Sequence, residues 1–449
     1  ATAGYLWINQ YPYIRDNSSW QSDVDLTGIF VGIIGCMIAG VAFGLFWMEI
    51  MKRYASTIIK TMLFLNIGCW IAVAILGLII GEMTLTIIGI VFAAFYALFS
   101  WCIWSRIPFS SALLSVSSSI TQTYGGTVFL SLMVILFDVI WIFVWGACVS
   151  AYYLVVDEPN SFVIFLLLVS FYWAFQVNQN ISHTTTCGVT ASWYFSTELN
   201  YNPTPPAFRR TMTTSFGSVC FGSLLVAIIQ ALEQMVRMAQ DQKNQCVACI
   251  LLCLLNCLEG MVRFFNKFAF AHCAIYGTGF IQSARQTFDL FASRGIQALI
   301  NDDLTGLAIF AGALIGGIVS AGVGYLLGYI FYNGDSNSDV RIGVPIALAV
   351  YGFFVGLLFC MTVLYVVHSS IVCLFVCYCE DPASLSENRP EEYQRIANVK
   401  PEFGAINTGR GGNGNAPQRQ QQQQSAQQGQ RQGYNDGNMY GNNSNKFAV

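Results

Sequence analysis

The sequence predicts an all-α protein, a polytopic transmembrane helical bundle of about nine to ten spans. Of its 449 residues, 55% are hydrophobic and only 10% are charged. A soluble domain of this composition has too few polar side chains to cover its apolar ones, so the excess is expected to face lipid. Several apolar runs also reach the roughly 20 residues that an α-helix needs to cross the hydrocarbon core. The lipid bilayer is therefore the first expected partner.

The predicted spans follow one another along most of the chain. Eight apolar runs meet the length requirement: residues 26–50, 57–81, 85–104, 128–154, 162–187, 213–236, 304–331 and 342–367. Region 246–281 is also apolar, but it is interrupted by four polar or charged side chains, Glu259, Arg263, Asn266 and Lys267. We expect this region to hold either one span or a membrane-surface helix followed by a span.

Composition divides the chain into three parts. Residues 1–25 are polar and aromatic and contain a sequon at Asn17, which can be glycosylated only on the extracellular or lumenal side. Residues 26–382 form the predicted transmembrane domain, and residues 383–449, rich in Gln, Asn and Gly, are expected to be a disordered tail. Basic residues follow the first and third spans, at Lys52, Arg53 and Arg106, so the positive-inside rule places the tail in the cytosol. We expect an integral protein of the plasma membrane or an organelle membrane.

One predicted span is unusually polar. Within residues 162–187 and just beyond, the side chains Trp173, Gln176, Asn180, His183 and Cys187 recur at helical spacing and share one face. Polar groups at membrane depth are costly unless they find partners in the bundle interior or in a water-filled cavity, so this face is expected to point inward. This polar face either lines a solute pathway or forms a row of hydrogen bonds that holds neighbouring helices together, which we call the seam interpretation.

A second polar feature is Asp138, near the middle of its predicted span. Trp141 and Trp145 follow on the same helical face. A carboxylate beside indole rings suits a quaternary ammonium, because the ring faces attract a cation that cannot donate hydrogen bonds. The alternative is a structural ion pair, with Lys60 of the second span as a possible partner. A further aromatic candidate, Tyr276, precedes two glycines that can break a helix.

Other kinds of chemistry have little support. The sequence contains no Gly-rich phosphate loop, no HExxH motif and only three histidines. We therefore expect no catalytic residue, no metal site and no cofactor, although His183 as a general base leaves a membrane acyltransferase as an alternative. Cys246, Cys249, Cys253 and Cys257 share a helical face, but no His or carboxylate completes a zinc ligand set of known spacing. The net charge of −3 gives no electrostatic reason to expect a nucleic-acid partner.

These polar stretches carry a resemblance to a known family. The segment from Trp173 to Phe195 reads W-x3-V-x2-N-x2-H-x-T-x2-G-x2-A-S-W-Y-F, which resembles the signature span of the choline transporter-like family, whose fungal branch includes the pH-nine-sensitive-type proteins. Four more stretches agree in order: RIPFSSALL (106–114), SFGSVCFGSLLVAIIQ (215–230), CLEGMVRFFNKFAFAHCAIYGTGFIQSAR (257–285) and CLFVCYCED (373–381).

The resemblance implies an all-helical bundle of about ten spans that moves choline or related cationic alcohols. Animal members have a long glycosylated outer loop after their first span, and this sequence begins near the end of such a loop, so about nine spans are expected. Two positions depart from the family pattern: Asp138 does not belong to it, and His368 stands where animal members tend to have an Asp.

The predicted function is transport of choline or a related small cationic alcohol through a central aromatic-lined cavity. Asp138 would supply the counter-charge, the rings would supply cation–π contacts, and Asn180 or His183 would hold the hydroxyl group. The expected substrate-binding residues are Trp173, Asn180, His183, Asp138, Trp141, Trp145, Trp193, Tyr194 and Tyr276. The alternative is a structural or accessory subunit of a membrane complex, whose polar face is sealed by neighbouring helices.

Overall fold

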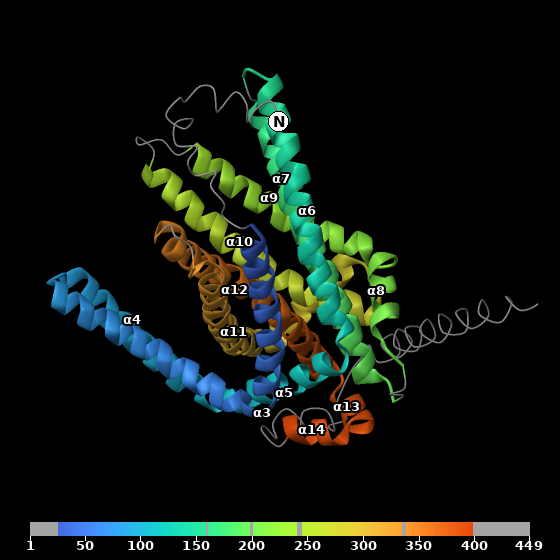
Figure 1. The fold of residues 1–449 in the computed structure, drawn as a ribbon. Helices are drawn as coiled ribbons and strands as arrows, with labels where there is room; N and C mark the ends of the chain where they lie inside the picture. Colours follow the sequence, from blue (N-terminus) through green and yellow to red (C-terminus); the bar gives the residue numbers. More distant parts are fainter. Residues whose placement is uncertain (1–25, 159, 198–200, 240–244, 335–337, 398–449) are drawn as a thin grey trace, which may run out of the picture. The chain divides into compact units, whose positions relative to one another are not determined.

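The computed structural model describes residues 26–158, 160–197, 201–239, 245–334 and 338–397, and every regular element among them is a helix (Figure 1). The sequon residue Asn17 lies outside the described residues, and so does the predicted tail (383–449) from residue 398 onward. The part of that tail before residue 398 is largely helical, so the expected disorder does not hold there. The elements are α3 (Leu26–Ile80), α4 (Met83–Ile103), η2 (Trp104–Arg106), α5 (Ile107–Thr123), α6 (Gly126–Val155), α7 (Ser161–Phe195), α8 (Thr204–Met212), α9 (Phe216–Met238), α10 (Gln245–Tyr276), α11 (Phe280–Tyr332), α12 (Ser338–Glu380), α13 (Pro382–Asn388) and α14 (Pro390–Ala397).

Eight helices in the described part of the chain are long and apolar enough to cross a membrane. The first of them, α3, contains a non-helical residue, Tyr54, with φ −123° and ψ 24°. Dividing α3 there leaves two segments that are each long enough to cross, so the eight helices supply nine candidate spans. Their large apolar side chains are widely exposed, for example Trp101 and Phe143, as a lipid-facing surface requires. The prediction of an all-α polytopic membrane protein is confirmed.

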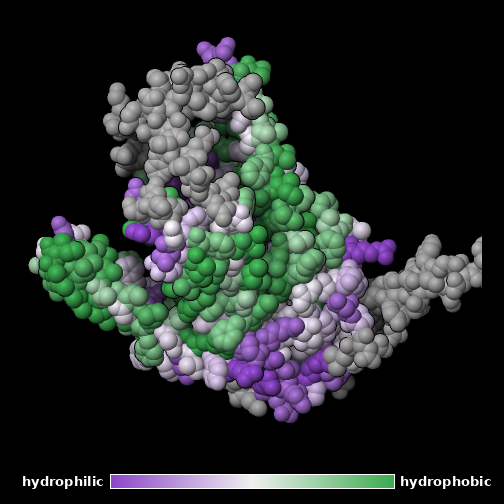
Figure 2. Space-filling model, in the orientation of Figure 1, coloured by the Kyte–Doolittle hydropathy of each residue, from purple (hydrophilic) through white to green (hydrophobic). Residues whose placement is uncertain are grey.

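The hydropathy of the visible surface agrees with this assignment. Figure 2 shows hydrophobic residues over much of the helical surface, whereas hydrophilic residues gather at the end where α13 and α14 lie in Figure 1. Both of these short helices begin with proline, whose missing N–H and fixed φ suit the first helical position.

The interrupted apolar region forms one long helix and a break. α10 continues through all four interrupting residues and ends at Tyr276. Gly277 then adopts a φ of 67°, the left-handed region that favours glycine, and α11 begins at Phe280. The region therefore holds one span followed by a break, and the alternative with a separate membrane-surface helix before the span is not what the structure shows.

The chain divides into two compact units. The smaller unit comprises residues up to Phe46 together with 311–361, so it contains the start of α3, the end of α11 and the start of α12. Its helices approach closely at glycines: a Cβ on Gly40 would lie 2.9 Å from both the Cα and the carbonyl oxygen of Gly356. Close backbone packing of this kind supplies van der Waals energy in lipid, where the hydrophobic effect between helices is absent.

The larger unit comprises Trp47–Phe310 and the chain from Thr362 onward. Within it α7 packs against α6, α8, α9 and α10. The helix begins with a side-chain cap, because Oδ1 of Asn160 accepts a hydrogen bond of 2.8 Å from the Phe162 N–H. All side chains from Ser182 to Ser192 are buried, whereas Trp173 nearer the cap is 38% exposed. The two halves of α7 therefore lie in different surroundings.

Candidate functional site

His183 lies in the buried half of α7, where it joins two other spans. Its side chain is 1% exposed, with Nε2 2.9 Å from the carbonyl oxygen of Lys267 on α10 and Nδ1 2.9 Å from the Ser369 hydroxyl on α12. A carbonyl oxygen only accepts, so Nε2 must carry a proton in this arrangement. Nδ1 faces the Ser369 hydroxyl, which itself donates to the carbonyl oxygen of Tyr365 at 3.1 Å, so both ring nitrogens have polar neighbours.

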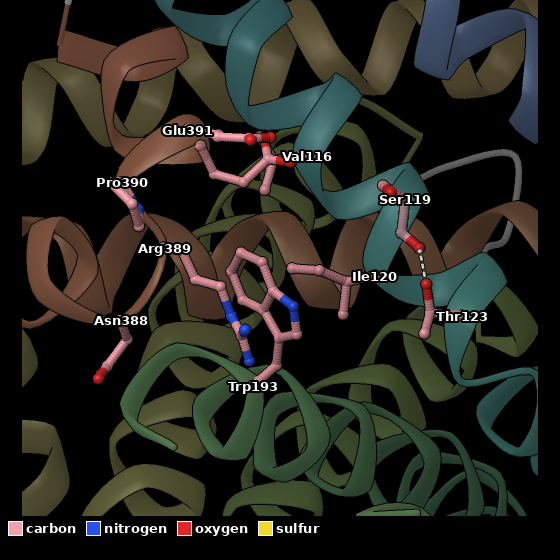
Figure 3. A pocket seen from close by; sticks show the side chains of 10 residues that line it. Val116, Ser119, Ile120, Thr123, Trp193, Asn388, Arg389, Pro390 and Glu391 are labelled. Carbon is pink, nitrogen blue, oxygen red and sulfur yellow. Dashed lines mark hydrogen bonds between the residues drawn. The ribbon is translucent and has the colours of Figure 1, made fainter. Parts of the chain in front are cut away.

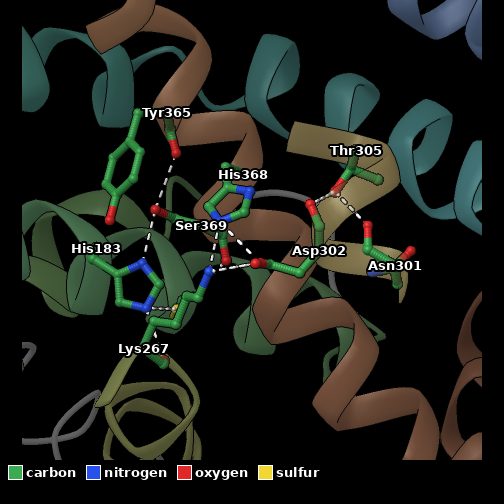
Figure 4. Close-up of polar contacts among 9 residues, drawn as sticks. His183, Lys267, Asn301, Asp302, Thr305, Tyr365, His368 and Ser369 are labelled. Atoms are coloured by element: carbon green, nitrogen blue, oxygen red, sulfur yellow. Dashed lines mark hydrogen bonds and ion pairs between the residues drawn. The ribbon is translucent and has the colours of Figure 1, made fainter. Parts of the chain in front are cut away.

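The side chain of Lys267 forms the centre of a charged cluster, which we define as His183, Lys267, Asp302 and His368 (Figure 4). Nζ of Lys267 donates to both carboxylate oxygens of Asp302 on α11, at 2.6 and 2.7 Å. Nε2 of His368 on α12 lies 3.3 Å from Oδ1 of Asp302 and 3.5 Å from the lysine Nζ. The lysine and aspartate side chains are each only 19% exposed.

Aromatic rings and further polar groups surround the charged cluster. The lysine ammonium lies over the ring of Phe264, 5.2 Å from its centroid. The ring of Tyr365 lies 5.8 Å from that of His368 and 6.4 Å from that of His183. Asn301 is 4% exposed, and its Oδ1 has no hydrogen-bond partner among the described residues. A carboxylate and an ammonium group thus lie together beside two aromatic rings.

The charged cluster is contributed by four candidate spans, α7, α10, α11 and α12. An ionised side chain at the centre of a bilayer costs on the order of 3 kcal/mol on insertion scales. The close Lys267–Asp302 pair reduces that cost, but apolar side chains of similar volume would avoid it altogether. The cluster is therefore the strongest candidate for a functional site in the described part of the chain.

The predicted face of α7 contacts α9 in its less buried half. Nε1 of Trp173 donates to the carbonyl oxygen of Cys220 at 2.9 Å, and Nδ2 of Asn180 donates to the Ser223 hydroxyl at 2.9 Å. Gln176, between them, donates to Oε1 of Gln230 at 3.1 Å. In this conformation these polar side chains hold two helices together, as the seam interpretation expects.

Asp138 lies apart from the charged cluster, at the contact of α6 with α7. Its Oδ1 accepts a hydrogen bond of 2.7 Å from Nδ2 of Asn178. Trp145 donates to the carbonyl oxygen of Leu167 at 2.9 Å, and Nε1 of Trp141 is buried without a partner among the described residues. The possible partner Lys60 instead lies over the ring of Trp104, 5.5 Å from its centroid.

Trp193 and Tyr194 lie at the far end of α7, beside the C-terminal helices. The Tyr194 hydroxyl donates to the carbonyl oxygen of Asp381 at 2.8 Å, and the Arg389 guanidinium lies 5.4 Å from the ring centroid of Trp193. A cavity of about 410 Å³ opens here (Figure 3), lined by Val116, Ser119, Ile120, Thr123, Trp193, Asn388, Arg389, Pro390, Glu391 and Glu392. Trp193 lines this cavity, and both aromatic residues lie roughly 15 Å along α7 from His183.

The ends of neighbouring helices are also joined by polar contacts. The Tyr276 hydroxyl donates to the Glu380 carboxylate, which links the last turn of α10 to that of α12. Nη2 of Arg210 on α8 lies 3.5 Å from the Ser192 hydroxyl of α7. Burial lowers the pKa of the Arg210 guanidinium, but arginine titrates so high that the group remains charged at neutral pH.

Arg389→Ala is expected to loosen α13 and α14 from the end of α7. The substitution removes the cation–π contact with Trp193 and a hydrogen bond of 3.3 Å to the Ser196 carbonyl oxygen, contacts worth roughly 1–3 kcal/mol together. Hydrogen–deuterium exchange of peptides covering 382–397 should become faster. Arg395→Ala is the control, because that side chain is 57% exposed and its contact with Glu392 is 3.4 Å long. Equal exchange in the two variants would contradict the expectation.

The sequence identified only part of the charged cluster. His183 was found from the helical face, and His368 from its departure from the family pattern. Lys267 was noticed as an interruption of an apolar run, whereas Asp302 lies just before the predicted span 304–331 and was missed. An ionisable residue next to an apolar run is the signal that could have identified it, because helices often extend beyond their most apolar part.

The fold and the charged cluster together define a polytopic helical membrane protein with ionisable groups buried among its spans. A family model described as "Plasma-membrane choline transporter" matches residues 87–383, and the chain belongs to this choline transporter-like family. The resemblance seen in the sequence is confirmed.

Several curated proteins are similar over most of this chain. A CTL-like protein of Dictyostelium discoideum is 34% identical over 361 residues, which cover 78% of this chain and 62% of the relative. Protein PNS1 of Kluyveromyces lactis is 28% identical over 400 residues, covering 82% of this chain and 72% of the relative. Protein pns1 of Aspergillus fumigatus is 32% identical over 352 residues, which cover 70% of this chain and 64% of the relative. The chain thus spans less than two thirds of the Dictyostelium and Aspergillus proteins.

Proposed function

We propose that this chain carries choline or a related small cationic alcohol across a membrane, by alternating access or by facilitated diffusion. The proposal is supported by family membership and by one observation: a Lys–Asp–His cluster lies buried where four candidate spans meet. Ionisable side chains at membrane depth are rare, and they commonly mark solute or ion pathways because they are costly to maintain for packing alone.

The polar face of α7 is proposed to line the path to the charged cluster. Trp173, Asn180 and His183 follow one another along this face, from the less buried half of the helix to the buried half. The present partners of Trp173 and Asn180 on α9 are a carbonyl oxygen and a hydroxyl group. The hydroxyl of a small alcohol can take over such a hydrogen bond, so the helices can separate without leaving a buried polar group unpaired.

Asp138, with Trp141 and Trp145, is proposed as a second cation contact, on the side of α7 that faces α6. The carboxylate is partly buried and accepts from an amide, Asn178, which carries no charge. Its negative charge is therefore not neutralised by that contact, and an incoming organic cation would provide the missing counter-charge. The aromatic residues at the ends of α7 and α10, Trp193, Tyr194 and Tyr276, would act at the exit of the pathway.

Radiolabelled choline uptake into proteoliposomes tests these assignments. Trp173→Ala and Asp138→Asn should each reduce uptake about tenfold, because one cation–π or charge contact is worth roughly 1–2 kcal/mol. Matched controls are Trp101→Ala, whose ring is 78% exposed, and Asp157→Asn in the loop after α6. Uptake by Trp173→Ala and Asp138→Asn at the wild-type rate would remove both residues from the proposed site.

A structural or accessory subunit is the second candidate function. The observation that favours it is the closure of the α7 face, where Trp173, Gln176 and Asn180 all bond to α9 and His183 is 1% exposed. The two functions give different results with purified protein. A transporter accumulates at least one labelled solute from a panel of choline, ethanolamine, betaine and nucleosides, whereas an accessory subunit accumulates none until its partner is added.

A further inference from the structure

The ammonium group of Lys267 lies in surroundings that suit an organic cation. Both carboxylate oxygens of Asp302 lie within 2.7 Å of it, and the Phe264 ring faces it at 5.2 Å. A carboxylate on one side and an aromatic face on the other are the two features that attract an ammonium group in a place shielded from water. We refer to Asp302 and Phe264 as the ammonium site.

We propose that the ammonium site binds the cationic group of the transported solute, and that Lys267 is a tethered cation which the solute displaces. This inference rests on the proposed function, which it deepens by naming the carboxylate and the ring that the solute contacts. The lysine keeps the site neutral when no solute is present, because an isolated carboxylate in that position would be costly. Occupation by lysine and by solute is mutually exclusive.

The backbone around Lys267 is held in place by contacts that do not involve its side chain. His183 donates to the Lys267 carbonyl oxygen at 2.9 Å, and the adjacent Asn266 donates to the carbonyl oxygen of Gly222 on α9 at 2.9 Å. These bonds fix α10 against α7 and α9. The lysine side chain has four rotatable bonds and a single charged group at its end, so it can leave Asp302 without movement of the helix.

The ammonium site also remains satisfied after the lysine leaves. Nε2 of His368 lies 3.3 Å from Oδ1 of Asp302, so the carboxylate retains a polar neighbour when a solute replaces the lysine. A quaternary ammonium donates no hydrogen bonds, and it requires only negative charge and aromatic surface. Asp302, Phe264 and the nearby ring of Tyr365 provide these.

Chemical rescue of Lys267→Ala tests the proposal directly. The substitution removes the side chain beyond Cβ, and the part removed corresponds to propylammonium. In detergent solution, propylammonium should raise the midpoint of thermal unfolding of Lys267→Ala in a saturable manner, because a ligand that binds the folded state stabilises it by mass action. Propanol, the neutral control, should have no such effect. Wild-type protein should not respond to propylammonium at the same concentrations, because its site is filled.

A second pair of ligands tests the solute class. Choline should stabilise Lys267→Ala, whereas 3,3-dimethyl-1-butanol, which has the same shape but no charge, should not. The response to both cations should disappear in the double variant Lys267→Ala/Asp302→Asn, which lacks the carboxylate. Equal responses to charged and neutral ligands, or rescue that persists without Asp302, would overturn the proposal.

The measurement remains decisive if Lys267→Ala is unstable alone. The variant is then purified with propylammonium present from lysis onward, and the amine is removed by gel filtration. The readout is the monodisperse gel-filtration peak. If propylammonium preserves this peak and propanol does not, the ammonium site is supported. If no cation preserves the peak, the site is refuted. Choline uptake by wild-type proteoliposomes is scored separately. If wild-type protein takes up choline but no cation stabilises Lys267→Ala, the transport function stands and the ammonium site is rejected. If cations stabilise Lys267→Ala but wild-type protein takes up no choline, the site stands and choline transport is rejected.

Discussion

Asp302→Asn is expected to lower the free energy of unfolding by about 3–5 kcal/mol, because it leaves the Lys267 ammonium buried without its counter-charge. The carboxylate holds the ammonium at 2.6 and 2.7 Å, and the two side chains are each 19% exposed. Unfolding of the purified protein in mixed detergent and SDS micelles, followed by tryptophan fluorescence, measures the change. Choline uptake by the variant should fall to the level of empty liposomes if Asp302 also contacts the solute.

The double variant Lys267→Met/Asp302→Asn separates the cost of an unpaired charge from the value of the pair. Both charges are then absent, so most of the lost stability should return even though the ion pair is gone. Glu49→Gln is the control, because the Glu49–Arg53 pair lies on one helix with side chains 36% and 67% exposed, and such pairs contribute at most about 1 kcal/mol. If Asp302→Asn lowered the free energy of unfolding no more than Glu49→Gln does, the Lys267 ammonium would not need Asp302 as its counter-charge.

The spans were predictable because they depend on local composition. Runs of apolar residues give the positions of helices that must satisfy their backbone within lipid. α6 and α9 follow the predicted runs closely, whereas α7 continues eight residues beyond its run, to Phe195. The course of α10 is harder to predict, because Glu259 and Lys267 reduce its apolar character without preventing a helix. Those side chains find partners on the same or neighbouring helices, which composition alone does not reveal.

The site was only partly predictable, for a geometric reason. Helical spacing correctly groups side chains on one face, but a face also extends along the helix axis at about 1.5 Å per residue. From Trp173 to Tyr194 that distance is roughly 30 Å, the thickness of the hydrocarbon core. The structure accordingly separates the predicted residues along α7: Trp173 bonds to α9, His183 belongs to the charged cluster, and Tyr194 bonds to the Asp381 carbonyl oxygen just before α13.

Pairing between helices was the second obstacle. Lys267 and Asp302 are separated by 35 residues, and their contact depends on how α10 and α11 pack after the break at Gly277. Asp138 illustrates the same point, because its partner Asn178 lies on the side of α7 opposite to the predicted polar face. Sequence periodicity describes one helix at a time, whereas the partner of a buried charge is set by the arrangement of several.

Gly40→Val is expected to destabilise the smaller unit by about 3 kcal/mol, at the upper end of the usual cost of overpacking. A Cβ at this position would lie 2.9 Å from the Cα and the carbonyl oxygen of Gly356. Backbone atoms cannot rotate aside as a flexible side chain can, so α3 and α12 must separate and lose van der Waals contact along their length. SDS-induced unfolding, followed by protease protection of residues 311–361, measures the effect.

Gly68→Val provides the matched control on the same helix, because a Cβ there meets no atom within 4 Å. Its effect should lie within about 0.5 kcal/mol, as for most substitutions away from close contacts. Gly40→Ala should fall between wild type and Gly40→Val, since one methyl group requires a smaller separation of the helices than three carbon atoms. A graded loss at position 40 with none at position 68 is the pattern that steric packing requires. Equal tolerance at both positions would mean that α3 and α12 do not pack backbone against backbone.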